Sequence, residues 1–173
     1  MKNALYVLIG LSLVISSCDK ETTPLESPQI TKPTVKTPVV TNLNNDLMLK
    51  LVNDKRIAGC NCGQTVMPPV PSLTWNDLLA AASLAHSKDM AANNFFAHES
   101  PSGKTTVNRV DEVGYNWLTL SENIANGHTD EQAVVDAWIA SEAHCKNIMS
   151  VNVKEMGAAR EGKYWTQVFG RAK

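Results

Sequence analysis

The stretch MGAAREGKYWTQVF, residues 156–169, decides the fold class because it predicts a β-hairpin near the end of the chain. Two strand-like runs, 156–160 and 164–169, are joined through Glu161 and Gly162, which favour a turn. Alternate residues of a strand point to opposite faces. In the second run one face is therefore expected to hold Trp165, Gln167 and Phe169, and the other Tyr164, Thr166 and Val168.

A first helix is predicted well upstream of this hairpin. Asn44 or Asn45 caps it, and it reaches about Ala58, with Gly59 as its stop. Its spacing predicts an inward face formed by Leu47, Leu51 and Ala58. The segment 60–73, rich in proline, is predicted to be a loop.

Further helices are predicted between that loop and the hairpin. One covers about 76–92, and the residues that share its inward face are Leu79, Ala82, His86 and Met90. A short helix with Val107 and Val110 inward ends at Gly114, and Thr129 with Gln132 forms a capping-box pattern that opens a helix carrying Trp138. Helices followed by an antiparallel sheet indicate an α+β fold rather than repeated βαβ units.

Composition and charge narrow the possible functions. The 173 residues are 43% hydrophobic and 19% charged, with a formal net charge of −1. This is enough apolar sequence for one domain with a real core. Charges of both signs are spread along the folded part without a basic stripe, so nucleic acid is not an expected partner.

The first residues predict export and attachment to a membrane. Lys2 precedes an apolar run from Ala4 to Ile15, which is shorter than the roughly 20 residues that span a bilayer but fits the apolar part of a secretory signal. The run ends in Ile15-Ser16-Ser17-Cys18, which resembles a lipobox. We therefore expect residues 1–17 to be a signal peptide and Cys18 to be lipidated. Ordinary cleavage beside an incidental cysteine, or an uncleaved apolar helix, are the alternatives.

A tether is predicted between the lipidated cysteine and the folded domain. Residues 19–41 contain four Pro and six Thr and no aromatic residue, so they bury too little apolar surface to fold alone. Spaced prolines favour an extended spacer. The expected organisation is thus a signal peptide at 1–17, a lipidated tether at 18–43, a folded domain at 44–173, and a place in the cell envelope outside the cytoplasm.

Three cysteines remain in the folded part, namely Cys60, Cys62 and Cys145. Outside the cytoplasm they can form at most one disulfide, which leaves one thiol. We prefer a Cys62–Cys145 bridge, because a Cys60–Cys62 bridge would close a very small ring. Zinc held by the Cys-Asn-Cys group and a histidine is the alternative, although its spacing is not the usual Cys-x₂-Cys.

Four polar residues stand in apolar or irregular surroundings and are the candidates for a binding cleft: His98, Glu122, His144 and Tyr164. Two imidazoles and a carboxylate can bind zinc or another divalent metal, which makes His98, Glu122 and His144 a possible metal site. A histidine beside a glutamate can also act as a general base. The alternatives are a core position for His98 and a loop-capping role for Glu122.

Several motifs together resemble the CAP superfamily of cysteine-rich secretory, antigen 5 and pathogenesis-related 1 proteins. They are SLTWNDLLAAASLAHSKDMAANNFFAHESPSG, GYNWLTLSENIANG, AWIASEAHCKNIM and YWTQVFG, and they are most similar to the bacterial SCP-like extracellular branch. The resemblance covers residues 44–173. It implies a three-layer α-β-α sandwich with a central antiparallel sheet.

The resemblance also implies a cleft with two histidines and two glutamates that binds zinc in many members. His98 matches the first histidine and Glu122 the first glutamate. Ser141 stands where the second glutamate is usual, with Glu142 one residue out of register, and Tyr164 replaces the second histidine. Only half of the tetrad is present, and His144 is a possible replacement.

Three functions are compatible with this sequence. The first is a non-enzymatic module that binds a small apolar ligand, a lipid, a peptide or another envelope component near His98 and Glu122. The second is a hydrolase of peptides or envelope polymers that uses these two residues as base and orienter. The third is a structural or adhesive envelope protein in which the cleft has no ligand.

Overall fold

The computed structural model describes residues 38–173, so the predicted signal peptide, Cys18 and most of the tether lie outside the described residues. The elements are α1 (Asn45–Ala58), β1 (Cys60–Cys62), β2 (Thr65–Met67), β3 (Thr74–Trp75), α2 (Asp77–Asn93), α3 (Thr106–Glu112), β4 (Trp117–Asn126), α4 (Glu131–Ala140), α5 (Glu142–Ile148), β5 (Glu155–Glu161) and β6 (Tyr164–Ala172). Within these residues no helix has the length and apolar character needed to cross a bilayer.

The sheet is built around the predicted C-terminal hairpin. Its order is β3-β5-β6-β4, and β6 pairs antiparallel with both β5 and β4. The short strand β3 instead pairs parallel with β5, so the sheet is mixed where a purely antiparallel one was expected. A parallel neighbour is possible here because the whole of α2, α3, β4, α4 and α5 lies between β3 and β5 in the chain.

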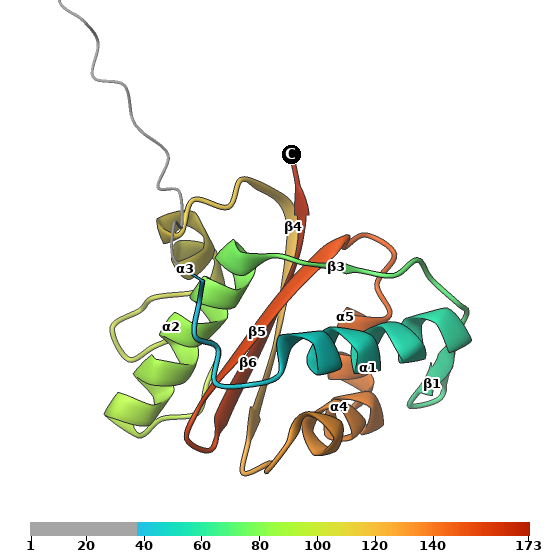
Figure 1. The fold of residues 1–173 in the computed structure, drawn as a ribbon, viewed down its shortest axis with the longest axis horizontal. Helices are drawn as coiled ribbons and strands as arrows, with labels where there is room; N and C mark the ends of the chain where they lie inside the picture. The colour runs from blue at the N-terminus through green and yellow to red at the C-terminus, as the bar shows by residue number, and fades with distance from the viewer. Residues whose placement is uncertain (1–37) are drawn as a thin grey trace, which may run out of the picture. The chain divides into compact units, whose positions relative to one another are not determined.

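Helices cover both faces of this sheet and give three layers (Figure 1). Alternate residues of β6 pack against the two helical layers, as the predicted alternation requires. Trp165 and Phe169 enter the core formed with α1, α4 and α5, whereas Val168 packs with Leu79 of α2 and Val110 of α3. The chain therefore has the α+β fold that the residue patterns predicted and the three layers that the family resemblance implied.

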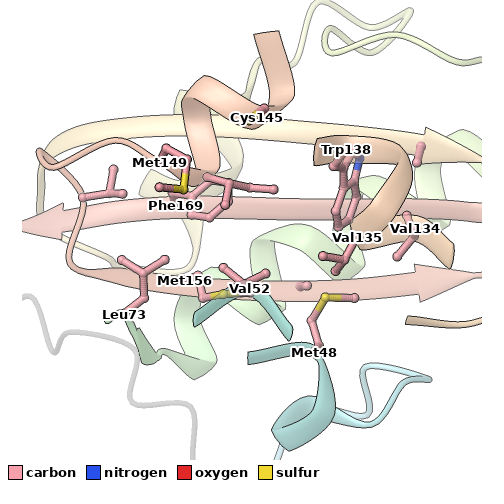
Figure 2. Close-up of a cluster of buried hydrophobic side chains, with 14 of the residues drawn as sticks. Met48, Val52, Leu73, Val134, Val135, Trp138, Cys145, Met149, Met156 and Phe169 are labelled. Atoms are coloured by element: carbon pink, nitrogen blue, oxygen red, sulfur yellow. The ribbon is translucent and has the colours of Figure 1, made fainter. Parts of the chain in front are cut away.

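The larger core lies between the sheet and the helices α1, α4 and α5 (Figure 2). Its bulkiest members, Trp138 of α4 with Trp165 and Phe169 of β6, are almost completely buried. Burying such side chains removes a large apolar area from water and is the main favourable term in folding. This core fixes α4 and α5 over one face of the sheet.

The inward face of α1 differs from the prediction. Asn44 caps the helix and Gly59 ends it, as expected, but the buried residues are Met48, Val52 and Arg56. Leu47 is 39% exposed and Ala58 is also exposed. The helix can bury Arg56 because its guanidinium donates hydrogen bonds to the backbone carbonyls of Pro71, Ile148 and Ser150. A hydropathy pattern does not predict that a charged residue is buried with its hydrogen bonds made.

The other predicted helices are present, with one correction to their ends. Asn76 caps α2, and all four residues expected on its inward face are buried. Of the two valines of α3 that were expected inward, Val110 is buried but Val107 is 39% exposed. The cap of α4 is Asp130, whose carboxylate accepts from the Ala133 N–H, and not Thr129.

Two segments fold differently from the expectation. The stretch 60–73 holds a small hairpin of β1 and β2 instead of being loop throughout. The folded domain also begins before residue 44. Thr41 is buried, and its carbonyl accepts the backbone N–H of Arg160 at 2.9 Å.

Candidate functional site

Glu122 is the centre of the candidate site. It lies on β4 and faces the layer formed by α2 and α3, with only 3% of its side chain exposed. Its Oε1 accepts a hydrogen bond from Nδ1 of His98 at 2.8 Å, and its Oε2 accepts one from Nη2 of Arg109 at 2.8 Å. Both oxygens of a buried carboxylate are therefore paired, which is the condition for burying such a charge at moderate cost.

Arg109 organises the loop that carries His98. Thr105 and Asn108 form a capping box that starts α3 and so places Arg109 on its inner side, where the arginine is 2% exposed. The guanidinium donates to the backbone carbonyls of His98 at 3.0 Å and Lys104 at 3.1 Å, besides its bond to Glu122. One buried cation thus joins the irregular loop, α3 and β4.

The charge state of Glu122 follows from these partners. Burial acts to raise the pKa of this carboxyl, but the hydrogen bond from His98 and the positive charge of Arg109 outweigh it. The pKa of Glu122 is lowered as a result. The group is therefore an anion that holds its neighbours in place, and it is a weak proton acceptor.

His98 is the exposed member of the pair. Its side chain is 56% exposed. Because the carboxylate of Glu122 only accepts, Nδ1 carries the proton, and Nε2 of the neutral ring is left as an acceptor. Nε2 receives no hydrogen bond from residues 38–173, so it is available to accept one from a ligand.

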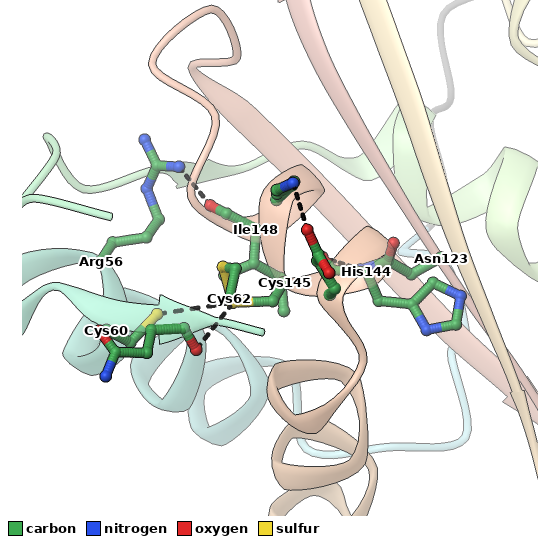
Figure 3. The surroundings of a disulfide bond; sticks show 10 residues. Arg56, Cys60, Cys62, Asn123, His144, Cys145 and Ile148 are labelled. Atoms are coloured by element: carbon green, nitrogen blue, oxygen red, sulfur yellow. Dashed lines mark hydrogen bonds and ion pairs between the residues drawn. A yellow bond between two sulfur atoms is a disulfide. The ribbon is translucent and has the colours of Figure 1, made fainter. Parts of the chain in front are cut away.

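His144 approaches the same edge of the sheet from the opposite layer. It lies on α5, and its backbone carbonyl accepts from Nδ2 of Asn123, the neighbour of Glu122 on β4 (Figure 3). The pKa of His144 is lowered by burial and, to a lesser extent, by repulsion from His98 when that ring is protonated. The backbone of His144 is thus joined to the strand that carries Glu122.

Tyr164 does not join this group. The pairing of β4 with β6 places it opposite Asn126, whereas Glu122 stands opposite Val168. A separation of four residues along a strand is about 13 Å. The ring packs with Met90 and Ile124, and its hydroxyl lies 3.3 Å from Oδ1 of Asn94. Tyr164 is therefore a packing residue in this fold.

His86 and Arg109 also surround Glu122, and neither was among the candidate site residues predicted from the sequence. His86 is fully buried. Its Nε2 donates a hydrogen bond to the backbone carbonyl of Ala97 at 3.0 Å, and the same atom lies 3.9 Å from Oε1 of Glu122. Burial lowers the pKa of His86. A buried glutamate needs a cationic partner, but no pattern in the sequence singles out Arg109 among the basic residues as that partner.

The residues present do not fit the zinc centre that the resemblance implies. Glu122 uses both oxygens for His98 and Arg109, so it is not available as a ligand. Glu142, the near match to the second glutamate, is exposed and pairs with Lys146. Two histidines remain, whereas zinc in proteins usually has at least three protein ligands.

Comparison with known proteins identifies the family. Residues 49–169 match the sequence profile of CAP, the cysteine-rich secretory protein family. The chain belongs to this family.

Individual relatives agree with this assignment. An uncharacterized protein of Bacillus subtilis, YkwD, is 35% identical over 96 residues, which cover 54% of this chain and 37% of YkwD. The structure of an extracellular protein of Bacillus anthracis that contains an SCP domain matches with a TM-score of 0.66 and 31% identity, over 73% of this chain and 40% of that one. An outer surface protein of Borrelia burgdorferi shares the fold, with a TM-score of 0.63 and 17% identity over 74% and 92% of the two chains. This chain therefore spans about two fifths of the length of the Bacillus proteins.

Proposed function

We propose that this CAP domain is a non-enzymatic binding module of the cell envelope, tethered to a membrane through Cys18, which binds its ligand at His98 and His144 beside β4. The observation that carries the proposal is the saturated state of Glu122. A carboxylate that already accepts from His98 and Arg109 fixes the imidazole and has little capacity to take up another proton. The pair is suited to presenting Nε2 of His98 as a fixed hydrogen-bond acceptor.

The surroundings of His98 favour a ligand with both polar and apolar parts. Nε2 of the neutral ring accepts a hydrogen bond from a hydroxyl or amide group. Phe96, two residues earlier in the same loop, is 49% exposed and offers apolar surface. This combination fits a lipid headgroup region, a peptide or another amphipathic envelope component.

The proposed location rests on the sequence and on the relatives. The lipobox-like end of the apolar run supplies the expected anchor at Cys18. The Bacillus anthracis relative is described as extracellular, and the disulfide of this domain suits an oxidising compartment. A lipid-anchored position outside the cytoplasm combines these observations.

Replacing His98 with alanine is the test of the binding site. We expect the wild-type chain, incubated with envelope lipids or with a peptide digest of the envelope, to gain a reproducible mass in native mass spectrometry. His98→Ala should weaken this binding about tenfold or more, which corresponds to one lost hydrogen bond of about 1.4 kcal/mol. His128→Ala is the matched control, since His128 contributes its backbone carbonyl to the fold. Equal binding by all three proteins would contradict the proposal.

A hydrolase is the second candidate, and one observation favours it. A carboxylate bonded to Nδ1 of a histidine, as between Glu122 and His98 at 2.8 Å, is the arrangement that orients a general base. If the chain is a hydrolase, His98→Ala should reduce turnover of envelope peptides or polymers by about 100-fold or more while the fold is retained. The absence of turnover by the wild-type chain across such substrates would remove this candidate.

A further inference from the structure

The strand β1 places two cysteines on one face. Residues two apart on a strand point the same way, so Cys60 and Cys62 both face the helix α5 (Figure 3). Cys62 forms a disulfide with Cys145 of α5, the pairing preferred from the sequence, with 5.4 Å between the Cα atoms. Cys60 is a free, half-buried thiol.

The free thiol lies against the bridge. Sγ of Cys60 is 3.6 Å from Sγ of Cys145, and the three sulfur atoms all lie within 4.8 Å of one another. A disulfide bond is about 2.05 Å long, so Cys60 needs to approach Cys145 by only about 1.6 Å to bond to it. A thiol and both sulfur atoms of a disulfide are thus gathered in one cluster, and rotation of the Cys60 side chain is needed to bring its sulfur in line with the Cys62–Cys145 bond for exchange.

We propose that Cys60 is an internal nucleophile that exchanges with the Cys62–Cys145 disulfide. The Cys60 thiolate attacks Sγ of Cys145, a Cys60–Cys145 bond forms, and the Cys62–Cys145 bond breaks. The electron pair leaves on the Cys62 sulfur, which takes up the proton that Cys60 released. Nothing is oxidised or reduced overall, so the step needs no external reagent, and it runs in both directions.

The rate of exchange follows the thiolate fraction of Cys60. Burial raises the pKa of this thiol, and the positive charge of Lys55 offsets part of that rise. Only a small fraction is ionised at neutral pH as a consequence. At pH values below the thiol pKa, an increase of one pH unit raises the thiolate fraction about tenfold. Exchange should therefore be about tenfold faster at pH 8 than at pH 7.

Exchange keeps α5 joined to the β1–β2 hairpin whichever bridge is present. Cys145 directly follows His144, and the same helix supplies Asn147, whose amide donates to the backbone carbonyl of Glu122 at 3.2 Å. Either bridge therefore supports the helix that borders the candidate site. Cys60 thus provides an alternative disulfide partner for Cys145.

Disulfide mapping tests this proposal on the full chain, purified in detergent without reductant. The protein is incubated at pH 8.5, then denatured at pH 6 with excess N-ethylmaleimide, digested with trypsin and sequenced by mass spectrometry. Cys60 and Cys62 share the peptide 57–88, and fragmentation shows which of them carries the maleimide. We expect label on both residues. Label confined to Cys60 would overturn the proposal.

Single substitutions give an independent test of the same exchange. In Cys62→Ser we expect the peptide 57–88 to be linked through Cys60 to the peptide 110–146. The Tm of this variant should lie closer to that of the wild type than to that of Cys145→Ser, which has no bridge. In Cys60→Ser the label on peptide 57–88 should disappear. Two free thiols in Cys62→Ser, with the Tm of Cys145→Ser, would show that Cys60 does not reach Cys145.

Discussion

Replacing Arg109 with leucine is expected to lower the free energy of unfolding by about 3 to 5 kcal/mol, because the buried carboxylate of Glu122 loses its cationic partner. The carbonyls of His98 and Lys104 lose a hydrogen-bond donor in the same variant. Urea unfolding at pH 7 measures the effect. Lys50→Ala is the matched control, since its ion pair with Asp54 is exposed and such pairs contribute about 1 kcal/mol or less.

The pH dependence of this loss distinguishes the ion pair from general packing. The pKa of Glu122 is lowered in the folded protein, so the stabilisation by Arg109 is present above the unfolded carboxyl pKa of about 4.3 and is lost as the pH falls through the folded value. Without Arg109, protonation of Glu122 relieves the buried charge. The difference between wild type and Arg109→Leu should therefore shrink from pH 7 to pH 3.

A double substitution completes the cycle. Arg109→Leu with Glu122→Leu removes both charges, and it should be more stable than Arg109→Leu alone, because no unpaired charge is left buried. A double variant as unstable as the sum of the two single variants would contradict the direct pairing. So would a difference between wild type and Arg109→Leu that stays constant with pH.

The strand β4 was not predicted from the sequence, and its polar residues explain why. Its middle contains Ser121, Glu122 and Asn123 in succession, and the last two are buried on opposite faces. Glu122 meets Arg109 and His98, while Asn123 bonds to Gln167 of β6. A strand with polar residues buried on both faces lacks the apolar alternation that marks a strand in a sequence.

The helix α2 and the hairpin of β5 and β6 were predictable for the opposite reason. Apolar residues recur on their buried faces with the helical or strand period, and Asn76 or a glycine marks the ends, although the polar residues Ser83, His86 and Gln167 are buried in them as well. The residues of the site, by contrast, come from a loop, α3, β4 and α5. The sequence indicated His98 and Glu122 through their apolar or irregular surroundings and then through the resemblance, but their contact with Arg109 exists only once α3 packs beside β4.

Replacing Gly157 with alanine is expected to lower the free energy of unfolding by about 3 kcal/mol or more, because α2 crosses β5 at this glycine without room for a methyl group. A Cβ at position 157 would lie 2.0 Å from the backbone nitrogen of Ala80 and 2.5 Å from the carbonyl carbon of Leu79. These atoms belong to the helix backbone, so no side-chain rotation relieves the clash. The close approach also lets Ser83 of α2 donate a hydrogen bond to the Gly157 carbonyl at 3.1 Å.

Two control variants identify the cause of this loss. Gly103→Ala has open space around the new methyl group but a φ of +82°, so it measures backbone strain alone and should cost about 1 kcal/mol. Adding Ala80→Gly to Gly157→Ala should not restore stability, because the clash involves the backbone nitrogen and not the Ala80 side chain. A wild-type Tm for Gly157→Ala would mean that α2 can move away from β5. Since α2 carries His86 and leads into the loop of His98, such freedom would also undermine a site that depends on fixed imidazoles.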